Sequence, residues 1–240
     1  MAIVSTKAIV FSSIKYGDTS LIVRCFTLKE GLKTYLIKGV LSAKRRKIKP
    51  AYFQPLTQLQ LVAIHNNKGN LNSIKEVHVL YPYKNMYANV FKQTIVLFLS
   101  EMVSNAIQEE EENASLYHYL ENAFSWLDSN NEVSNFHLLF LLNLTQFLGF
   151  YPDLSGSDKE GFNLMEGSFV EFTSEKEVIF GNNLVQFKKL LGINFDTING
   201  VLFNKKERQQ VLRIIIRYFE LHLDGFKNPK SLGVLETVFS

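Results

Sequence analysis

A dense run of cations, Lys44-Arg45-Arg46-Lys47-Ile48-Lys49, is the strongest chemical feature of this 240-residue sequence. Neighbouring like charges repel one another and destabilise a fold unless something acidic offsets them. The run by itself fits either a solvated loop or an arm that binds phosphates. Its surroundings favour the arm, because further cations lie on neighbouring predicted strands and turns where acidic residues are nearly absent. The predicted nucleic-acid contacts are Lys15, Arg24, Lys33, Lys38, Lys44, Arg45, Arg46, Lys47 and Lys49.

Aromatic side chains near these cations could add a second kind of contact. Tyr35 or Tyr52 could stack on the bases of a bound strand. Core packing is the commoner role for any one aromatic residue, so both interpretations stay open.

The residue types that commonly perform catalysis form no recognisable site in the sequence. The five histidines lie in no His-Glu-x-x-His or Glu-x-x-His pattern. No phosphate-binding glycine loop and no Gly-x-Ser-x-Gly elbow is present. Cys25 follows Arg24 in an apolar run, which favours a packed thiol over a nucleophile. We therefore expect no enzymatic activity, no bound metal and no cofactor.

Positive charge is concentrated at one end of the chain. Residues 1–80 carry a net charge of +10 and residues 81–240 a net charge of −7, within a whole-chain charge of +3. This split predicts a basic nucleic-acid-binding domain at 1–80 and a second domain at 81–240. The four glutamates at 109–112 are typical of a solvated loop between helices, because adjacent carboxylates do not converge on one point.

Composition limits the class of protein and its compartment. With 46% hydrophobic and 20% charged residues, the chain can bury a core. Its single cysteine excludes a disulfide framework and fits a reducing compartment. Apolar runs such as 95–99 are far shorter than the roughly 18 residues of a membrane span, and the N-terminus has no signal-peptide pattern. We expect a cytoplasmic protein.

Hydrophobic periodicity divides the chain into two parts. Up to about residue 80, apolar residues alternate in five short runs separated by turn sequences, which predicts a small closed barrel of the five-stranded OB-fold type. Beyond Pro82 the spacing becomes helical, with Pro82 in the first turn. The fold class is therefore α+β multidomain, an OB-fold β-barrel followed by an α-helical bundle domain. The predicted strands are 6–11, 20–25, 32–37, 58–63 and 71–79.

The helical domain is predicted to have one central helix and one irregular insertion. The helix at 134–149 is apolar almost all round, which favours burial on every side. The insertion around 151–181 is rich in Gly, Ser, Asp and Glu, with a short hairpin at 162–172. The other predicted helical segments are 86–106, 114–127, 183–191, 205–223 and a short last element at 230–238.

Several short motifs resemble the bacterial recombination mediator family RecO, and they follow one another in the family's order. In the first third they are Thr6-Lys7-Ala8-Ile9-Val10, Tyr16-Gly17-Asp18-Thr19-Ser20-Leu21-Ile22-Val23, Phe26-Thr27, Gly31-Leu32 and Lys38-Gly39. In the remainder they are Phe147-Leu148-Gly149-Phe150-Tyr151-Pro152-Asp153-Leu154, Phe162-Asn163-Leu164, Gly167-Ser168-Phe169, Leu221-His222-Leu223 and Lys230-Ser231-Leu232. The resemblance covers most of the chain.

This resemblance implies an OB-fold and a helical domain in a nucleoid-associated DNA repair protein. It implies binding to single- and double-stranded DNA and annealing of complementary strands. The implied partners are RecR, in some species RecF, and the C-terminal tail of the single-stranded DNA-binding protein, which act together to load the recombinase. Many family members carry a four-cysteine zinc site after a Pro-Asp-Leu stretch. Here Pro152-Asp153-Leu154 continues without cysteine, so we expect packing and hydrogen bonds to hold this loop in place of zinc.

The implied tail partner suggests a second site, in the helical domain. Such a tail ends in acidic residues and an apolar Pro-Phe carboxyl terminus, which requires an apolar pocket beside a cation. Arg213 and Arg217 lie one turn apart on a predicted helix and are the candidate carboxylate contacts. The alternative is a solvated face on which they pair with Glu220.

Two other functions stay open at this point. An OB-fold RNA-binding or translation-type factor would have the same charge pattern, and competition between RNA and DNA oligonucleotides would distinguish it. A hydrolase with an unrecognised site would show metal-dependent nuclease activity.

Overall fold

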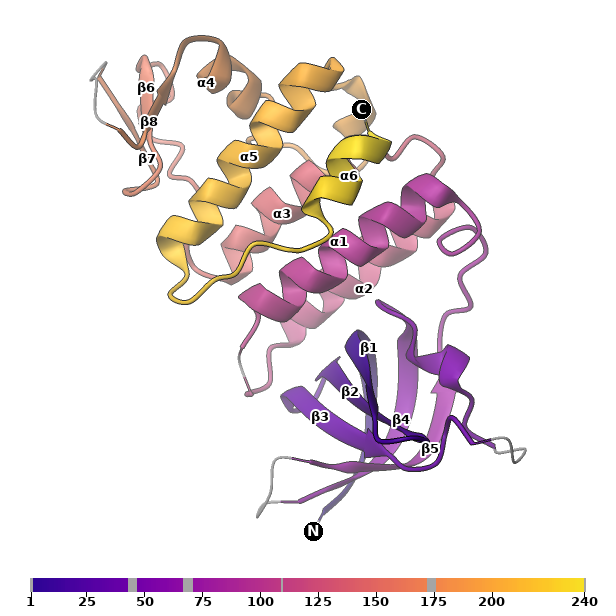
Figure 1. The fold of residues 1–240 in the computed structure, drawn as a ribbon. Coiled ribbons are helices and arrows are strands. Elements are labelled where there is room, and N and C mark those ends of the chain that lie inside the picture. The colour runs from indigo at the N-terminus through magenta and orange to yellow at the C-terminus, as the bar shows by residue number, and fades with distance from the viewer. Residues whose placement is uncertain (1, 43–46, 67–70, 109, 172–175, 240) are drawn as a thin grey trace. The chain divides into compact units, whose positions relative to one another are not determined.

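A computed structural model of the chain describes residues 2–42, 47–66, 71–108, 110–171 and 176–239 (Figure 1). Contacts divide the chain into two compact units, Met1–Ser129 and Asn130–Ser240. The first unit contains a sheet and two helices, and the second contains helices and a small sheet. A domain boundary at residue 80 stays a prediction: it separates the sheet from the helices, whereas the first compact unit continues to Ser129.

The first unit is built on a five-stranded antiparallel sheet, as the alternation predicts. Its strand order is β3-β2-β1-β4-β5. This sheet, followed by helices, confirms the α+β class. The strands are β1 (Ala2–Tyr16), β2 (Ser20–Thr27), β3 (Gly31–Ile37), β4 (Gln58–His65) and β5 (Ser73–Val79), and a 3-10 turn, η1 (Pro50–Phe53), precedes β4.

The predicted closed barrel is not closed by strand pairing, because β3 and β5 are the two edges of the sheet. In the described residues, an isolated β-bridge at Asn72, just before β5, joins the two edges. The Leu36 N–H donates to the Asn72 carbonyl at 2.9 Å, and the Asn72 N–H donates to the Thr34 carbonyl at 2.8 Å. The result is the partly open barrel that is typical of an OB-fold.

Strand β1 is long because it takes part in both halves of the sheet. Residues 2–9 pair with β4, and residues 8–16 pair with β2. Phe11 lies at a bulge, where Val10 pairs with Cys25 and Ser12 with Arg24. One face of β1 packs in the barrel core through Ala8 and Val10. The other face is also buried at Ile9 and Phe11, so the middle of β1 does not show the alternation of a half-exposed strand.

The second face of the sheet is covered by helices α1 (Val90–Ala106) and α2 (Ala114–Ser129). The Phe11 and Phe26 rings stack at 5.7 Å between centroids, and Phe26 stacks on Tyr117 of α2 at 6.4 Å. The residues Ile95, Phe98, Leu99 and Met102 of α1 are fully buried. Burial of this apolar area joins the sheet and the two helices into one unit.

The start of α1 differs from the prediction. Pro82 is not in a helical first turn; α1 begins at Val90, and Asn89 caps it by accepting from the backbone N–H groups of Phe91 and Lys92. The side chain of an Asn cap accepts hydrogen bonds from N–H groups of the first turn that would otherwise be unsatisfied. A proline in the first turn only lacks one such N–H group, so the Asn cap determines the start of the helix more strongly. Residues 80–89 connect β5 to the helix.

Asp128, at the end of α2, anchors this connection. Its buried carboxylate accepts from the backbone N–H groups of Lys84, Asn85 and Met86 at 2.7–3.0 Å. The ammonium of Lys92, also buried, donates to the Asp128 carbonyl at 2.7 Å, and burial lowers the pKa of Lys92. Three backbone donors on one buried carboxylate fix the connection between sheet and helices.

In the part of the chain that the structure describes, the second unit contains four α-helices and one short 3-10 element. Nine of the twelve residues of α3 are buried, which confirms the prediction of an almost wholly buried helix. In the described residues, no helix is long and apolar enough to cross a membrane. The elements are α3 (Phe136–Phe147), α4 (Gly181–Lys188), η2 (Ile198–Gly200), α5 (Lys205–His222) and α6 (Leu232–Val238).

The predicted irregular insertion contains a three-stranded sheet with the order β7-β6-β8. The predicted hairpin is confirmed as β6 (Gly161–Asn163) and β7 (Ser168–Val170), and β8 (Val178–Phe180) adds a third strand. The loop before β6 is held as expected by hydrogen bonds. The Lys159 N–H donates to the Gly156 carbonyl, its ammonium to the Phe169 carbonyl, and the Lys188 ammonium to the Lys159 carbonyl.

Candidate nucleic-acid interface

A groove runs along the partly open edge of the barrel, where β3 approaches β5. It consists of two adjoining hollows of about 270 and 460 Å³ that share Ile37, Lys38 and Ile48. The remaining lining residues of the first are Val40, Lys47 and Lys75, and of the second Leu36, Ile64, Asn66, Leu71, Asn72, Ser73 and Ile74. The lining contains three lysines and no acidic residue among the described residues.

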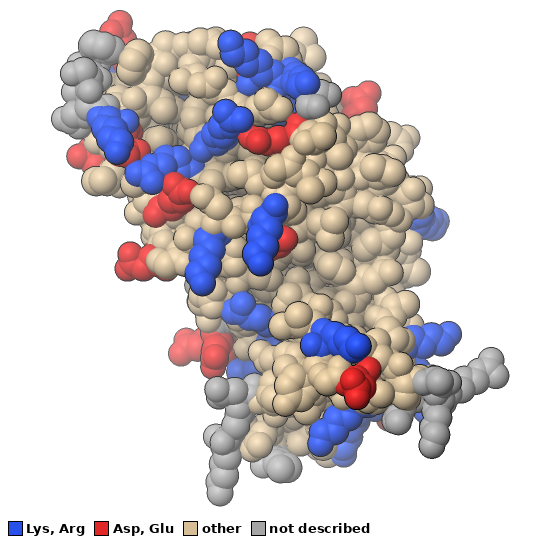
Figure 2. All heavy atoms as spheres, in the orientation of Figure 1, with Lys and Arg blue, Asp and Glu red and all other residues tan. Residues whose placement is uncertain are grey.

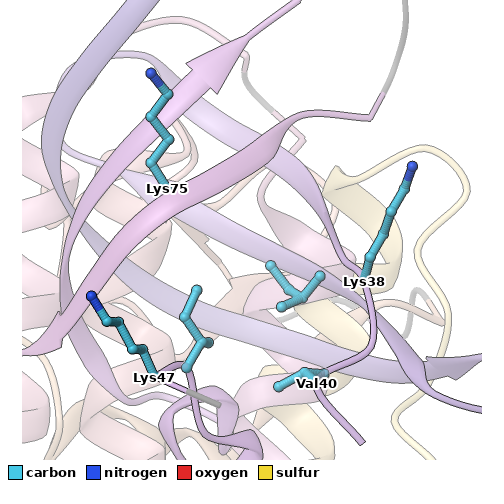
Figure 3. Close-up of a pocket in the computed structure, with 6 residues that line it drawn as sticks. Lys38, Val40, Lys47 and Lys75 are labelled. Atoms are coloured by element: carbon cyan, nitrogen blue, oxygen red, sulfur yellow. The ribbon is translucent and has the colours of Figure 1, made fainter. Parts of the chain in front are cut away.

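The three lysines come from three separate segments of the chain (Figure 3). Lys38 follows β3, Lys47 lies before η1, and Lys75 lies on β5. All three are exposed, and Figure 3 shows their side chains extending away from Val40. Ammonium groups gathered around an apolar floor can neutralise phosphates that are spaced along a strand.

A β-bulge gives Lys75 its place in the groove. In the β4–β5 ladder Val62 pairs with Glu76 but Ala63 pairs with Ile74, so Lys75 has no partner across the ladder. Ile74 therefore packs against the barrel core and Lys75 is exposed. The sequence reasoning missed Lys75, because simple alternation with the core residue Val77 would place it inside the barrel.

Two of the predicted contacts, Arg24 and Lys33, reach the end of α1 instead of the groove. The Arg24 guanidinium donates to the Ser104 carbonyl at 3.0 Å and to Gln108 Oε1 at 2.8 Å. Partial burial lowers its pKa, and the nearby Glu110 opposes that shift. The Lys33 ammonium lies 3.4 Å from the Glu110 carbonyl. These contacts give both cations a structural role within the first unit.

The other predicted contacts are exposed or outside the described residues. Lys15 is exposed near the β1–β2 turn, and Lys49 is exposed before η1. Lys44, Arg45 and Arg46 lie outside the described residues. On the face shown in Figure 2, Lys and Arg side chains occur over both units, with Asp and Glu among them. Of the predicted set, the structure brings together Lys38 and Lys47 in the groove.

The two tyrosines considered for base stacking belong to the core. Tyr35 is fully buried, and its hydroxyl hydrogen-bonds His65 Nε2 at 3.0 Å. Burial raises the pKa of Tyr35. His65 Nδ1 in turn contacts the Glu30 carboxylate. Tyr52 packs, partly buried, against the same core.

The two arginines considered for tail binding already hold carboxylates of this chain. Arg217 makes a bidentate pair with Glu177 at 2.7 and 3.1 Å and a third bond to Glu220 at 2.9 Å. These bonds raise the pKa of Arg217 and lower those of both glutamates. Arg213 donates through Nε to Glu236 at 3.0 Å, and its side chain is 68% exposed. A tail carboxylate would therefore meet Arg213 more easily than Arg217.

The described residues contain no group of three or more His, Cys, Asp or Glu that could hold a metal ion. Cys25 is fully buried, and burial raises the pKa of its thiol, so it is protonated at neutral pH. Buried His137 has its pKa lowered to about 3 by burial, which keeps it neutral. Neither group has the exposure of a nucleophile or a general base.

We predict that the purified protein contains no stoichiometric zinc. A structural zinc site needs about four converging ligands, and the single cysteine of this chain is buried in the barrel. Chelator should leave the melting temperature unchanged, whereas it unfolds proteins that depend on zinc. Elemental analysis finding about one zinc per chain would refute this prediction.

Comparison with known proteins decides the family. Residues 1–83 match the family described as "Recombination protein O N terminal", and residues 88–232 match "Recombination protein O C terminal". The chain belongs to the recombination protein O family. This assignment confirms the resemblance to RecO. The family's two parts meet between residues 83 and 88, in the connection that Asp128 anchors.

Curated relatives cover nearly the whole chain. The chain is 48% identical over 238 residues to a protein of Flavobacterium johnsoniae named "DNA repair protein RecO", with 99% of each chain covered. It is 45% identical to the protein of that name from Christiangramia forsetii, again over 99% of each chain. It is 33% identical to the one from Phocaeicola vulgatus, over 98% of each chain.

Proposed function

We propose that this protein is a non-catalytic recombination mediator in DNA repair. It binds single- and double-stranded DNA, anneals complementary strands, and helps load the recombinase onto strands coated by the single-stranded DNA-binding protein. The observation that supports this most is the groove with Lys38, Lys47 and Lys75 at the open edge of an OB-fold barrel. The names of the relatives support the repair role.

The mechanism needs charge neutralisation and no covalent step. Lysines and the basic segment after β3 offset the phosphates of a bound strand, which lowers its repulsion from a complementary strand. Lys15 and Lys49 are further exposed cations of the first unit, and the sequence adds Lys44, Arg45 and Arg46 between Lys38 and Lys47. RecR, RecF and the tail of the single-stranded DNA-binding protein are the partners we propose.

Annealing of oligonucleotides tests this function. Two complementary strands, each coated with the cognate single-stranded DNA-binding protein, should pair faster when the full chain is present. The variant with Lys38, Lys47 and Lys75 all replaced by Gln should lose this acceleration. Equal acceleration by the variant, or none by the native protein, would contradict the proposal. Stronger binding to RNA than to DNA in competition would favour an RNA-binding factor.

We predict that Arg213→Glu together with Arg217→Glu weakens binding of a tail peptide by about 10-fold or more, because the charge that meets its carboxylate is reversed. Fluorescence anisotropy with a labelled acidic peptide ending in Pro-Phe measures this. Annealing of uncoated DNA should stay intact. The matched control is Lys205→Glu with Lys206→Glu, two exposed cations at the start of the same helix.

Single substitutions distinguish the contributions of the two arginines to tail binding. Arg217 is engaged in ion pairs with Glu177 and Glu220, so Arg213 is the more available of the two. Arg213→Glu alone should account for most of the loss, and a melting curve reports any unfolding caused by Arg217→Glu. Unchanged tail affinity, or an equal loss of annealing on uncoated DNA, would place the tail site elsewhere.

A further inference from the structure

The floor and walls of the groove are aliphatic. Its apolar lining residues are isoleucine, leucine and valine: Leu36, Ile37, Val40, Ile48, Ile64, Leu71 and Ile74. The sequence bordering the groove also lacks Phe, Tyr and Trp at 38–51 and 64–80. Its two imidazole rings, His65 and His78, line neither hollow, and His65 is buried. OB-folds that bind single strands commonly stack bases on aromatic side chains, and the described lining of this groove contains no such side chain.

The aromatic rings of the barrel are placed where they cannot serve the groove. Phe11, Phe26, Tyr35 and Phe53 are at most 2% exposed. Tyr52 is partly buried against the barrel core and lines neither hollow. Tyr16 is 55% exposed, but it lies at the β1–β2 turn and lines neither hollow. Tyr16 is therefore the matched control for any stacking contact outside the groove.

The polar groups of the groove suit a phosphodiester backbone. Lysine ammonium groups are flexible point charges that contact phosphate oxygens without reading a base. The Asn72 side chain is occupied, since its amide donates to the Thr34 carbonyl and its oxygen accepts from the Asn66 N–H. It therefore has little capacity left to hydrogen-bond a base edge. Aliphatic side chains offer contact to the apolar faces of sugars.

We propose that this groove binds the sugar-phosphate backbone alone and leaves the bases unstacked and free to pair. This inference deepens the proposed function and rests on it. A strand held by its bases must leave its stacking platform before it can pair, whereas a strand held by its backbone presents its bases directly. The groove would then bind a chain of deoxyribose phosphates that lacks bases as well as it binds DNA.

Fluorescence anisotropy with two labelled 20-mers tests the inference on the full chain. One probe is oligo-dT, and the other has the same backbone with abasic residues throughout. We expect dissociation constants within about 3-fold of each other, since even one stacked base would separate them by about 5-fold or more. Tyr16→Leu should leave this ratio unchanged. Replacing Lys38, Lys47 and Lys75 with Gln should weaken both probes by the same factor.

The outcomes separate this inference from the proposed function. If oligo-dT binds and the abasic probe binds about 5-fold or more weakly, the inference is overturned and DNA binding stays intact. If Tyr16→Leu lowers the ratio of the affinity for oligo-dT to the affinity for the abasic probe, bases stack at the β1–β2 turn, and this result also overturns the inference. Failure of both probes to bind overturns the proposed function together with the inference.

Discussion

Replacing Lys44, Arg45, Arg46 and Lys47 with Ala should make the salt dependence of single-strand binding less steep. The slope of log affinity against log salt concentration should become smaller in magnitude by about 3. Each phosphate neutralised on a single strand contributes a slope of roughly 0.7 through counterion release. At 0.1 M salt the affinity should fall about 100- to 1,000-fold, and it should fall by the same factor for every sequence, because phosphate contacts carry no sequence information. Anisotropy titrations at several salt concentrations measure the slope.

A charge-matched control keeps this result specific to the basic segment. Replacing Lys176, Lys205, Lys206 and Lys230 with Ala removes four exposed cations from the second unit and lowers the net charge equally. The control should change the slope little, because charges that do not contact the strand release few of its counterions. A slope that is unchanged in the first variant, or equally flattened in both, would exclude the segment as a phosphate-binding arm.

Replacing Asp128 with Ala should destabilise the fold by about 3–5 kcal/mol. The change leaves the N–H groups of Lys84, Asn85 and Met86 without their shared acceptor, and loss of a buried charged partner is expensive. Urea unfolding of the full chain measures the change in the free energy of unfolding. Asp128→Asn should be milder, because the amide oxygen still accepts from one or two of the donors.

Asp158→Ala is the matched control, since Asp158 is exposed in the loop before β6. A surface substitution of this kind changes stability by about 0.5 kcal/mol or less. An effect of Asp128→Ala below about 1 kcal/mol would show that water replaces the carboxylate at the three donors, contrary to the burial of this residue.

The sequence predicts most of the strands and helices because the patterns that specify them lie within the segments themselves. Period-two alternation bounded by turn sequences places all five strands, and the apolar helix at 134–149 is found as α3. Pro82 fails as a helix start because a capping Asn89 and the distant Asp128 determine the connection. Asn89 is a cap signal that the local sequence contains, whereas the contact of Asp128 with residues 84–86 is not visible near Pro82.

The site is less predictable because it depends on contacts between distant segments. The pairing of Arg217 with Glu220 follows from their spacing, but its bidentate partner Glu177 lies 40 residues away. Arg24 was predicted to face a ligand, and its hydrogen bonds to Ser104 and Gln108 span about eighty residues. Lys75 reaches the groove through a bulge, and a bulge leaves no simple period in the sequence.

The stack of Phe11 and Phe26 on Tyr117 has a consequence for the order in which the chain folds during synthesis. The five strands leave the ribosome before α2, so one face of the new sheet must wait for its covering helices. A nascent chain ending at Leu80 carries Ile9, Phe11 and Phe26 uncovered, and such a face is a target for chaperones and for aggregation. The first point at which the barrel can bury both of its faces is release of residue 129.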